Sequence, residues 1–272
     1  MRFFDSHCHL EDWMIDEIKR SDTKLVCNIG CDYKAAFEAV ELAKKYDFVY
    51  GTVGIHPEYA NTAVNVEEAY SPAQAAAYGA YYQEPTVVDD IKELAKKPKI
   101  VAIGEIGLDL HWEDNPPKDV QIECFREQIE IAKELGKPIC IHSRDADRLT
   151  FDILKGSRAF ENIKVLMHCY SGSAELAKEY LKEGAWISIA GPVTYKGNKK
   201  TAEVVRTVPL DRLLIETDSP YLAPEPVRGK PNHPGNVCHT AAKIAEIKEL
   251  PLEEVAEATF INACKFYGIE LQ

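Results

Sequence analysis

The chain alternates short apolar runs with longer amphipathic segments, and this alternation limits its fold more than any other feature of the sequence. Eight apolar runs predict strands at Phe3–Ser6, Lys24–Gly30, Val49–His56, Lys99–Leu108, Pro138–Ser143, Lys164–Cys169, Ala185–Gly191 and Arg212–Asp218. Helical periodicity predicts helices at Tyr33–Tyr46, Val87–Lys97, Lys118–Leu135, Asp145–Lys155, Ser173–Glu183, Lys199–Val208, Asn236–Lys248 and Leu252–Tyr267.

Strands that alternate with helices form a parallel sheet, because each parallel strand needs a crossover connection. Eight such units in 272 residues match the count of a TIM-type barrel. A doubly wound open sheet is the alternative, but the glycine-rich first turn that it needs is missing. No linker or shift in composition divides the chain. We therefore predict a single α/β domain over residues 1–272, folded as a (β/α)8 TIM-type barrel.

One interval is longer than a single crossover helix requires, since over forty residues separate His56 from the strand at Lys99. Asn61–Glu84, which contains the Ala/Tyr-rich sequence AQAAAYGAYY, is therefore predicted to be an insertion between strands 3 and 4. A surface loop is one interpretation, because extra loop length costs little free energy. A lid that shapes substrate access to the barrel mouth is the other.

Composition excludes several classes of protein. A hydrophobic content of 46% is too high for a disordered chain. No apolar stretch reaches the roughly 18 residues that cross a bilayer, so we expect no membrane association. The net charge of −12 argues against a broad basic coat for nucleic acid. Eight scattered cysteines and no visible signal peptide predict reduced thiols and a cytoplasmic location, and no obligate protein partner is evident.

Side chains of the metal-ligand type stand at the ends of five apolar runs. They are His7, His9, Glu105, His142, His168 and Asp218. Strand alternation places His7 and His9 on one face, turns Cys8 away from them and turns Cys169 away from His168. In a barrel, all six ligands would open at the carboxyl ends of the strands. Gathering them without a cation would cost several kcal/mol, so the pattern predicts a divalent-metal site.

The chain also carries an ordered set of longer motifs: FDSHCHL, VGIHPE, VAIGEIGLD, IHSRDA, HCYSGS and LIETDSPYLAPEPVRG, with EVAEATFINACKFYGI near the end. In these motifs it resembles the TatD family of metal-dependent deoxyribonucleases, within the amidohydrolase-like TIM barrels. The resemblance covers nearly the whole chain and is interrupted mainly at Asn61–Glu84. One loop departs from the family pattern, because His233 stands where the family usually has Glu. That departure concerns substrate preference and leaves the metal ligands unchanged.

The resemblance implies two divalent metal ions (Mg, Mn, Zn or Ni). The first would be held by His7, His9, Glu105 and Asp218, and Glu105 would bridge to the second, completed by His142 and His168. Glu105 and Asp218 are the expected catalytic residues, and Asp218 would accept the proton of the attacking water. His56 would contact the phosphate from the side. Arg144 and Arg228 are candidate phosphate contacts through their planar guanidinium groups.

The predicted activity is therefore metal-dependent hydrolysis of phosphodiester bonds by a 3′-to-5′ deoxyribonuclease, with DNA or another phosphate ester bound weakly and by its end. Hydrolysis of an ester or amide, for example an aminoacyl-tRNA ester, is the alternative. Relatives that hydrolyse cyclic amides often bridge their metals with a carboxylated lysine where this chain has Glu105, which favours phosphate esters. A binding module without turnover is a third hypothesis, but no ligand is lost here.

Other polar residues near the strand ends have less specific interpretations. Asp5 is predicted to orient a histidine ligand as a hydrogen-bond acceptor. Asp109 either shapes the loop after strand 4 or caps a turn. His111 and Trp112 are either a place for a base to stack or an exposed loop pair. Lys196, Lys199 and Lys200 form either a site for a polyanion or ordinary surface.

Overall fold

The protein is described here by a computed structural model, which covers residues 1–63 and 88–270. Parallel strands follow one another in the order β1 to β8: β1 (Phe3–Cys8), β2 (Thr23–Gly30), β3 (Val49–Val53), β4 (Ile100–Asp109), β5 (Ile139–Arg144), β6 (Val165–Met167), β7 (Trp186–Ile189) and β8 (Leu213–Ile215). Backbone hydrogen bonds join the end of β1 to the segment that follows β8. They run from Asp218 N to His7 O at 2.9 Å and from His9 N to Ser219 O at 2.7 Å. The predicted eight-stranded barrel is confirmed.

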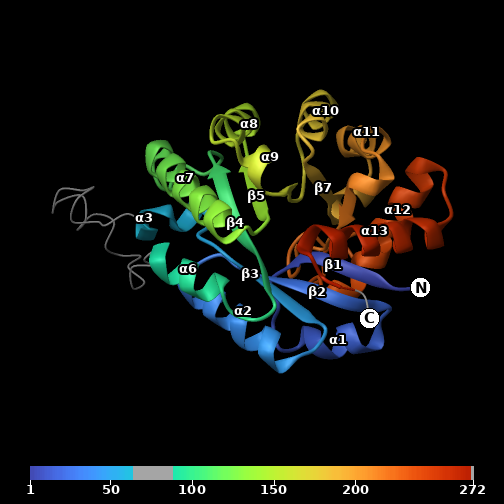
Figure 1. The fold of residues 1–272 in the computed structure, drawn as a ribbon. Coiled ribbons are helices and arrows are strands. Elements are labelled where there is room, and N and C mark those ends of the chain that lie inside the picture. Colours follow the sequence, from blue (N-terminus) through green and yellow to red (C-terminus); the bar gives the residue numbers. More distant parts are fainter. Residues whose placement is uncertain (64–87, 271–272) are drawn as a thin grey trace.

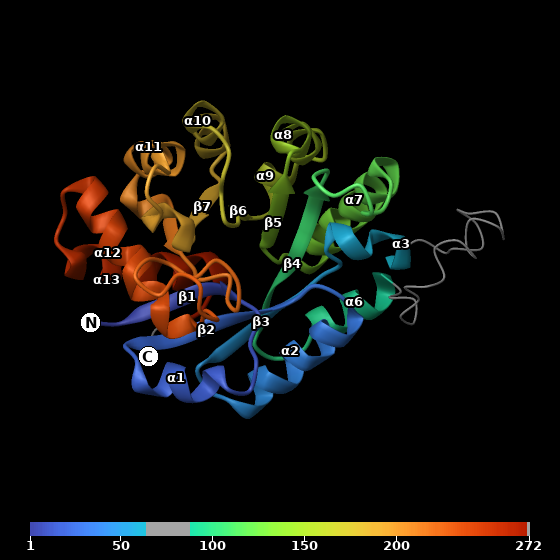
Figure 2. The same cartoon turned by 180° about the vertical axis from the view of Figure 1, so that it is seen from behind.

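Helices surround the strands on the outside (Figures 1 and 2). They are α1 (Met14–Arg20), α2 (Tyr33–Lys45), α3 (Ala60–Ala63), α6 (Val88–Ala95), α7 (Lys118–Leu135), α8 (Asp147–Gly156), α9 (Ala159–Asn162), α10 (Ala174–Lys182), α11 (Lys199–Thr207), α12 (Val237–Lys248) and α13 (Leu252–Tyr267). Short 3-10 turns lie at Pro57–Tyr59, Gly191–Thr194, Leu210–Arg212 and Pro234–Asn236. The eight predicted helices are confirmed to within two residues at each end, whereas α1, α3 and α9 were not predicted.

The apolar core of the described residues has two large parts, and a smaller cluster lies between α1 and the first strands. One fills the space between the strands and the outer helices. The other fills the inside of the barrel, where Phe4, Ala102, Cys140, Leu166 and Leu214 pack against the last helix, α13, through its residues Phe260, Cys264, Phe266 and Tyr267. The hydroxyl of Tyr267 donates to the carbonyl of Ser6 at 2.7 Å. Because α13 covers the amino ends of the strands, the carboxyl ends remain available for a site.

The chain between β3 and β4 runs through α3 and α6. The predicted insertion Asn61–Glu84 begins within α3, and residues 64–84 lie outside the described part of the chain. Both interpretations of the insertion therefore stay predictions. All eight cysteines are free thiols. Among the described helices, none combines the length and the apolar character that a membrane span requires.

Candidate metal centre

A pocket of about 890 Å³ opens at the carboxyl ends of the strands. Its lining includes side chains from six strand ends: His9, His56, Glu105, His142, His168 and Asp218. His7 lies beneath them and has no exposed surface. The barrel thus brings the six predicted ligands and His56 together in one place.

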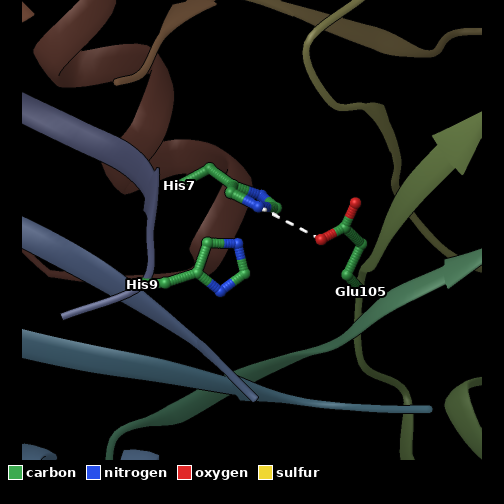
Figure 3. Close-up of side chains that lie close together, drawn as sticks. All are labelled: His7, His9 and Glu105. Atoms are coloured by element: carbon green, nitrogen blue, oxygen red, sulfur yellow. Dashed lines mark ion pairs between the residues drawn. The ribbon is translucent and has the colours of Figure 1, made fainter. Parts of the chain in front are cut away.

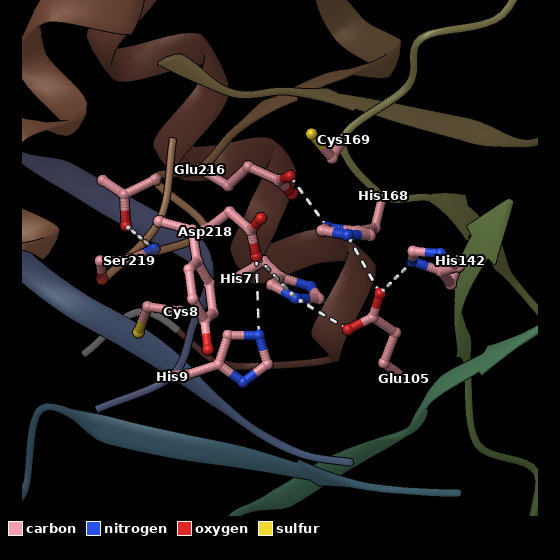
Figure 4. A network of polar contacts seen from close by, with 12 residues as sticks. His7, Cys8, His9, Glu105, His142, His168, Cys169, Glu216, Asp218 and Ser219 are labelled. Carbon is pink, nitrogen blue, oxygen red and sulfur yellow. Dashed lines mark hydrogen bonds and ion pairs between the residues drawn. The ribbon is translucent and has the colours of Figure 1, made fainter. Parts of the chain in front are cut away.

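Glu105 lies at the centre of this group, and its side chain is only 4% exposed. Its Oε2 is 3.3 Å from His7 Nε2 (Figure 3). Its Oε1 accepts a hydrogen bond from His142 Nδ1 at 2.7 Å and lies 3.1 Å from His168 Nε2 (Figure 4). The Nε2 of His56 is 3.8 Å from the same Oε1. The two carboxylate oxygens therefore face two adjoining groups of imidazoles, which meet where the rings of His7 and His168 stack at a centroid distance of 3.6 Å.

The first group is completed by Asp218. Its Oδ1 lies 3.6 Å from His7 Nε2 and 3.5 Å from His9 Nε2 (Figure 4). Donor atoms placed tetrahedrally around one ion at 2.0–2.2 Å would be roughly 3.4 Å apart, so these separations fit a shared cation. The Nδ1 of His7 is buried and has no hydrogen-bond partner, while its Nε2 faces the carboxylates of Glu105 and Asp218. Because a buried nitrogen without a partner is costly, the donor set suits a metal ion.

The electrostatics of the pocket keep both central carboxylates ionised. Burial by itself would raise the pKa of Glu105, but the neighbouring His168 and His7 and the hydrogen bond from His142 outweigh it and hold that pKa well below its usual range. Burial by itself would also raise the pKa of Asp218. The hydrogen bond between Asp218 and His9 and the charges of the neighbouring imidazoles outweigh burial and lower that pKa below its usual value. The pocket therefore presents two negative charges, as a cation site requires.

Two further carboxylates contact the imidazoles. Asp109 Oδ2 lies 3.2 Å from His142 Nε2, and Glu216 Oε1 lies 2.9 Å from His168 Nδ1. Glu216 has no exposed surface, and its other oxygen accepts the hydroxyl of Ser188 at 2.5 Å. Contacts of this kind orient histidine ligands in metal sites. Glu216 was not predicted as a site residue, although its spacing of two residues from Asp218 is the signal that could have found it.

Asp5 accepts a hydrogen bond from a predicted histidine ligand, His7, but from its backbone and not from its ring. Its carboxylate accepts hydrogen bonds from the backbone N–H of Thr217 at 2.8 Å and from the Thr217 hydroxyl at 2.5 Å, and from the backbone of His7 at 3.4 Å. Asp5 therefore joins β1 to the residue before Asp218 and acts on the backbone of both ligands.

Strand alternation predicted the direction of one cysteine correctly and of another wrongly. Cys8 packs in the cluster with Ile15 and Ile18 of α1, away from the pocket, as predicted. Cys169, in contrast, lines the pocket together with His168. The reason is that β6 ends at Met167 and Cys169 has a φ of 42°, so the alternation of a strand does not extend to it.

The predicted phosphate contacts divide into two groups. His56 and Arg144 line the pocket, whereas Arg228 is not among the described lining residues. Arg228 lies over the ring of Tyr195, 4.3 Å from its centroid. Lys196, Lys199 and Lys200 do not line the described pocket either. His233, which marks the departure in the loop after β8, faces Trp13 at a ring distance of 6.3 Å.

Comparisons with known proteins show the family of the chain. A family model described as TatD related DNase matches residues 4–268. The uncharacterized metal-dependent hydrolase YabD of Bacillus subtilis (strain 168) is 41% identical, over 98% of this chain and 99% of that protein. The uncharacterized metal-dependent hydrolase YcfH of Escherichia coli (strain K12) is 33% identical, over 99% and 97%. The crystal structure of YJJV, a TatD homologue from Escherichia coli K12, matches with a TM-score of 0.80 at 27% identity, over 99% of each chain. The chain therefore belongs to the TatD family of metal-dependent hydrolases.

Proposed function

We propose that the protein is a phosphodiesterase that uses two divalent metal ions to remove nucleotides from the 3′ end of DNA. The observation that carries this proposal is the position of Glu105, whose two oxygens face two adjoining groups of imidazoles. A bridging carboxylate suits a pair of ions a few Å apart, which is a common arrangement in nucleases and phosphatases. The residues that would hold the ions are His7, His9 and Asp218 on one side of Glu105 and His142 and His168 on the other.

When bound, the two ions would neutralise the charge of the phosphate oxygens and lower the pKa of a nearby water molecule. Asp218 is ionised and faces the pocket, so it would accept the proton of the attacking water. Burial lowers the pKa of His56 to about 3, which keeps its ring neutral. Its Nδ1 accepts the backbone N–H of Glu58 at 3.2 Å, which leaves Nε2 to carry the hydrogen and donate it to a phosphate oxygen.

The charges around the pocket support a substrate held by its end. Arg144 is the one lysine or arginine among the described lining residues, whereas Glu11, Glu38 and Glu58 also line the pocket. The whole chain carries a net charge of −12. A long duplex laid across this surface would be repelled. The end of a single strand that enters the pocket would instead meet Arg144 and the metal ions.

The direct test is cleavage of single-stranded DNA labelled at its 3′ or its 5′ end, with Mg²⁺ or Mn²⁺ and with or without a chelator. We expect rapid release of the 3′ label and stepwise shortening of the 5′-labelled strand. Glu105→Gln and Asp218→Asn should each lower the rate by more than about 100-fold, because each removes a charge from the centre. Glu203→Gln, an exposed change on α11, is the matched control and should leave the rate unchanged.

Cleavage that a chelator or Glu105→Gln leaves unaffected would contradict the proposal. The same preparations are assayed on an aminoacyl ester and a cyclic amide, because a metal-activated water can also attack a carbonyl. Hydrolysis of the ester or amide without cleavage of DNA would assign the centre to the alternative reaction. Tight metal binding without hydrolysis of any substrate would indicate a binding module.

A further inference from the structure

An exposed tryptophan stands at the pocket, and the proposed hydrolysis does not use it. Trp112 is 54% exposed and lines the pocket that contains the candidate metal centre. It follows β4, the strand that carries Glu105. Exposing so much of an aromatic ring does not stabilise the fold, and exposed aromatic surface in a pocket is typical of ligand contact.

The loop that carries Trp112 is held in place by buried hydrogen bonds. Asp109, whose carboxylate contacts His142, accepts the backbone N–H of His111 at 3.0 Å. The side chain of Gln121 pairs with both the N–H and the carbonyl of Asp109, each at 2.9 Å. These bonds set the position of the ring relative to the centre before any ligand arrives, which lowers the entropy cost of binding.

A cation lies against this ring. The guanidinium of Arg144 is 5.0 Å from the centroid of Trp112, within the range of a cation–π contact. Arg144 ends β5, two residues after His142, and it lines the same pocket. A planar guanidinium binds phosphate oxygens with two parallel hydrogen bonds, and an indole ring stacks on any base. The pair can therefore bind both parts of a nucleotide, the base through the indole and the phosphate through the guanidinium.

A second exposed aromatic side chain lines the pocket from the other side of the centre. Tyr221, in the segment after β8, is 63% exposed. Its ring packs against His9 at a centroid distance of 6.1 Å. Exposed aromatic rings near strands β4 and β8 give successive bases of a single strand two surfaces to stack on.

We propose that Trp112 and Arg144 form a nucleotide subsite beside the metal centre. Trp112 stacks on a base of a single-stranded nucleic acid, and Arg144 holds the phosphate attached to that nucleotide. This inference rests on the proposed function and narrows its substrate class. The substrate is a strand that carries bases, rather than a sugar phosphate or a phosphodiester without a base.

The test compares equilibrium binding of two short strands of equal length and charge, an oligothymidylate and its abasic counterpart. Both carry phosphorothioate linkages, which resist hydrolysis, so that binding can be measured with Mn²⁺ present. The wild-type protein should prefer the oligothymidylate. Trp112→Ala should weaken binding of that strand by about 5- to 100-fold and leave the abasic strand unaffected, while Trp112→Phe keeps part of the preference. Trp13→Ala, which removes an exposed tryptophan outside the described pocket lining, should change neither affinity.

Arg144→Ala should weaken binding of both strands by the same factor. The slope of log affinity against log salt concentration should fall by about one, as expected for one lost phosphate contact. Equal affinity of the wild-type protein for the two strands would overturn the inference. No measurable binding of either strand, or a base preference that Trp112→Ala leaves unchanged, would overturn it as well. Cleavage of unmodified abasic DNA with Mn²⁺ reports separately on the proposed function, because that strand needs the metal centre but no base.

Discussion

Replacing Glu216 by Gln would test how far the candidate metal centre depends on a carboxylate that does not face the pocket. Glu216 is fully buried, 2.9 Å from His168 Nδ1, and accepts the hydroxyl of Ser188. Gln has nearly the same shape, so Glu216→Gln removes a charge and an acceptor without opening a cavity. The imidazole of His168 would then lose the group that orients its ring and increases its basicity.

The distance gives the size of the effect. Two unit charges 2.9 Å apart attract by about 6 kcal/mol at an effective dielectric constant of 20, and the cost of burying both charges cancels most of this. Loss of such a partner typically weakens metal binding by about 10- to 100-fold, or about 1.4–2.7 kcal/mol. We expect this loss for Mn²⁺ in Glu216→Gln. Ser188→Ala, which keeps the charge of Glu216, should show a smaller loss.

The contact between Glu216 and His168 should also make the free energy of unfolding of the metal-free protein depend on pH. Burial opposes the charged form of His168, but Glu216 and Glu105 outweigh it and raise its pKa well above 6.5. The resulting stability is fully present below pH 6.5 and is lost as the pH rises through the folded-state pKa. Glu216→Gln should therefore lower the free energy of unfolding more at pH 6 than at pH 9.

Two measurements check this reasoning, namely calorimetric titration with Mn²⁺ and urea unfolding in a chelator at the two pH values. A Kd for Mn²⁺ within twofold of wild type would refute the orienting role of Glu216. A larger loss of stability at pH 9 than at pH 6 would refute the charged state assigned to His168.

Three further changes test the framework around the site. Gly107→Ala would place a Cβ 2.0 Å from the carbonyl oxygen of His142, at a φ of 143°, and should cost more than about 3 kcal/mol in urea unfolding. Gln121→Ala leaves the buried N–H of Asp109 without its partner, while the carbonyl of Asp109 keeps the side chain of Asn115 at 3.2 Å, so we expect a loss of about 1–3 kcal/mol and faster hydrogen exchange at that amide. The pKa of His56 is lowered to about 3, so below pH 6.5 the unfolded chain binds a proton that the folded chain excludes, and stability falls as the pH drops. His56→Asn, which can keep the cap of the following turn, should reduce this acid sensitivity in urea unfolding between pH 6.5 and pH 4.

The fold could be predicted because its periodic segments are long and carry clear signals at their ends. The predicted bounds of Lys118–Leu135 and Leu252–Tyr267 agree with α7 and α13 at both ends, and each of these helices is followed by a glycine with a positive φ. The helix α1 was missed because it has only seven residues, of which Met14, Ile15 and Ile18 are buried. A segment of two turns is too short for the period of 3.6 residues to stand out.

The residues facing the pocket could be predicted from strand ends, but their partners could not. Asp5 and Glu216 are both acidic residues two positions from a predicted ligand. Which of them meets an imidazole depends on the register shift in β1 between Asp5 and Cys8 and on the end of β8 at Ile215. Similarly, whether Arg228 reaches the pocket depends on the path of the segment after β8. Sequence spacing encodes neither the register nor the path of that segment.

The net charge of −12 constrains how a nucleic acid would approach, without deciding whether it is cut. The two divalent ions of the proposed function would add four positive charges at Glu105, and Arg144 contributes one more at the pocket lining. Screening at physiological salt limits this attraction to about 8 Å, which spans only one or two nucleotides. Beyond that distance a strand meets the acidic surface, so binding energy has to come from the terminal nucleotide itself. A stacking surface at Trp112 would supply that energy where the electrostatic attraction of a basic groove is missing, and it favours a frayed single-stranded end over a paired one.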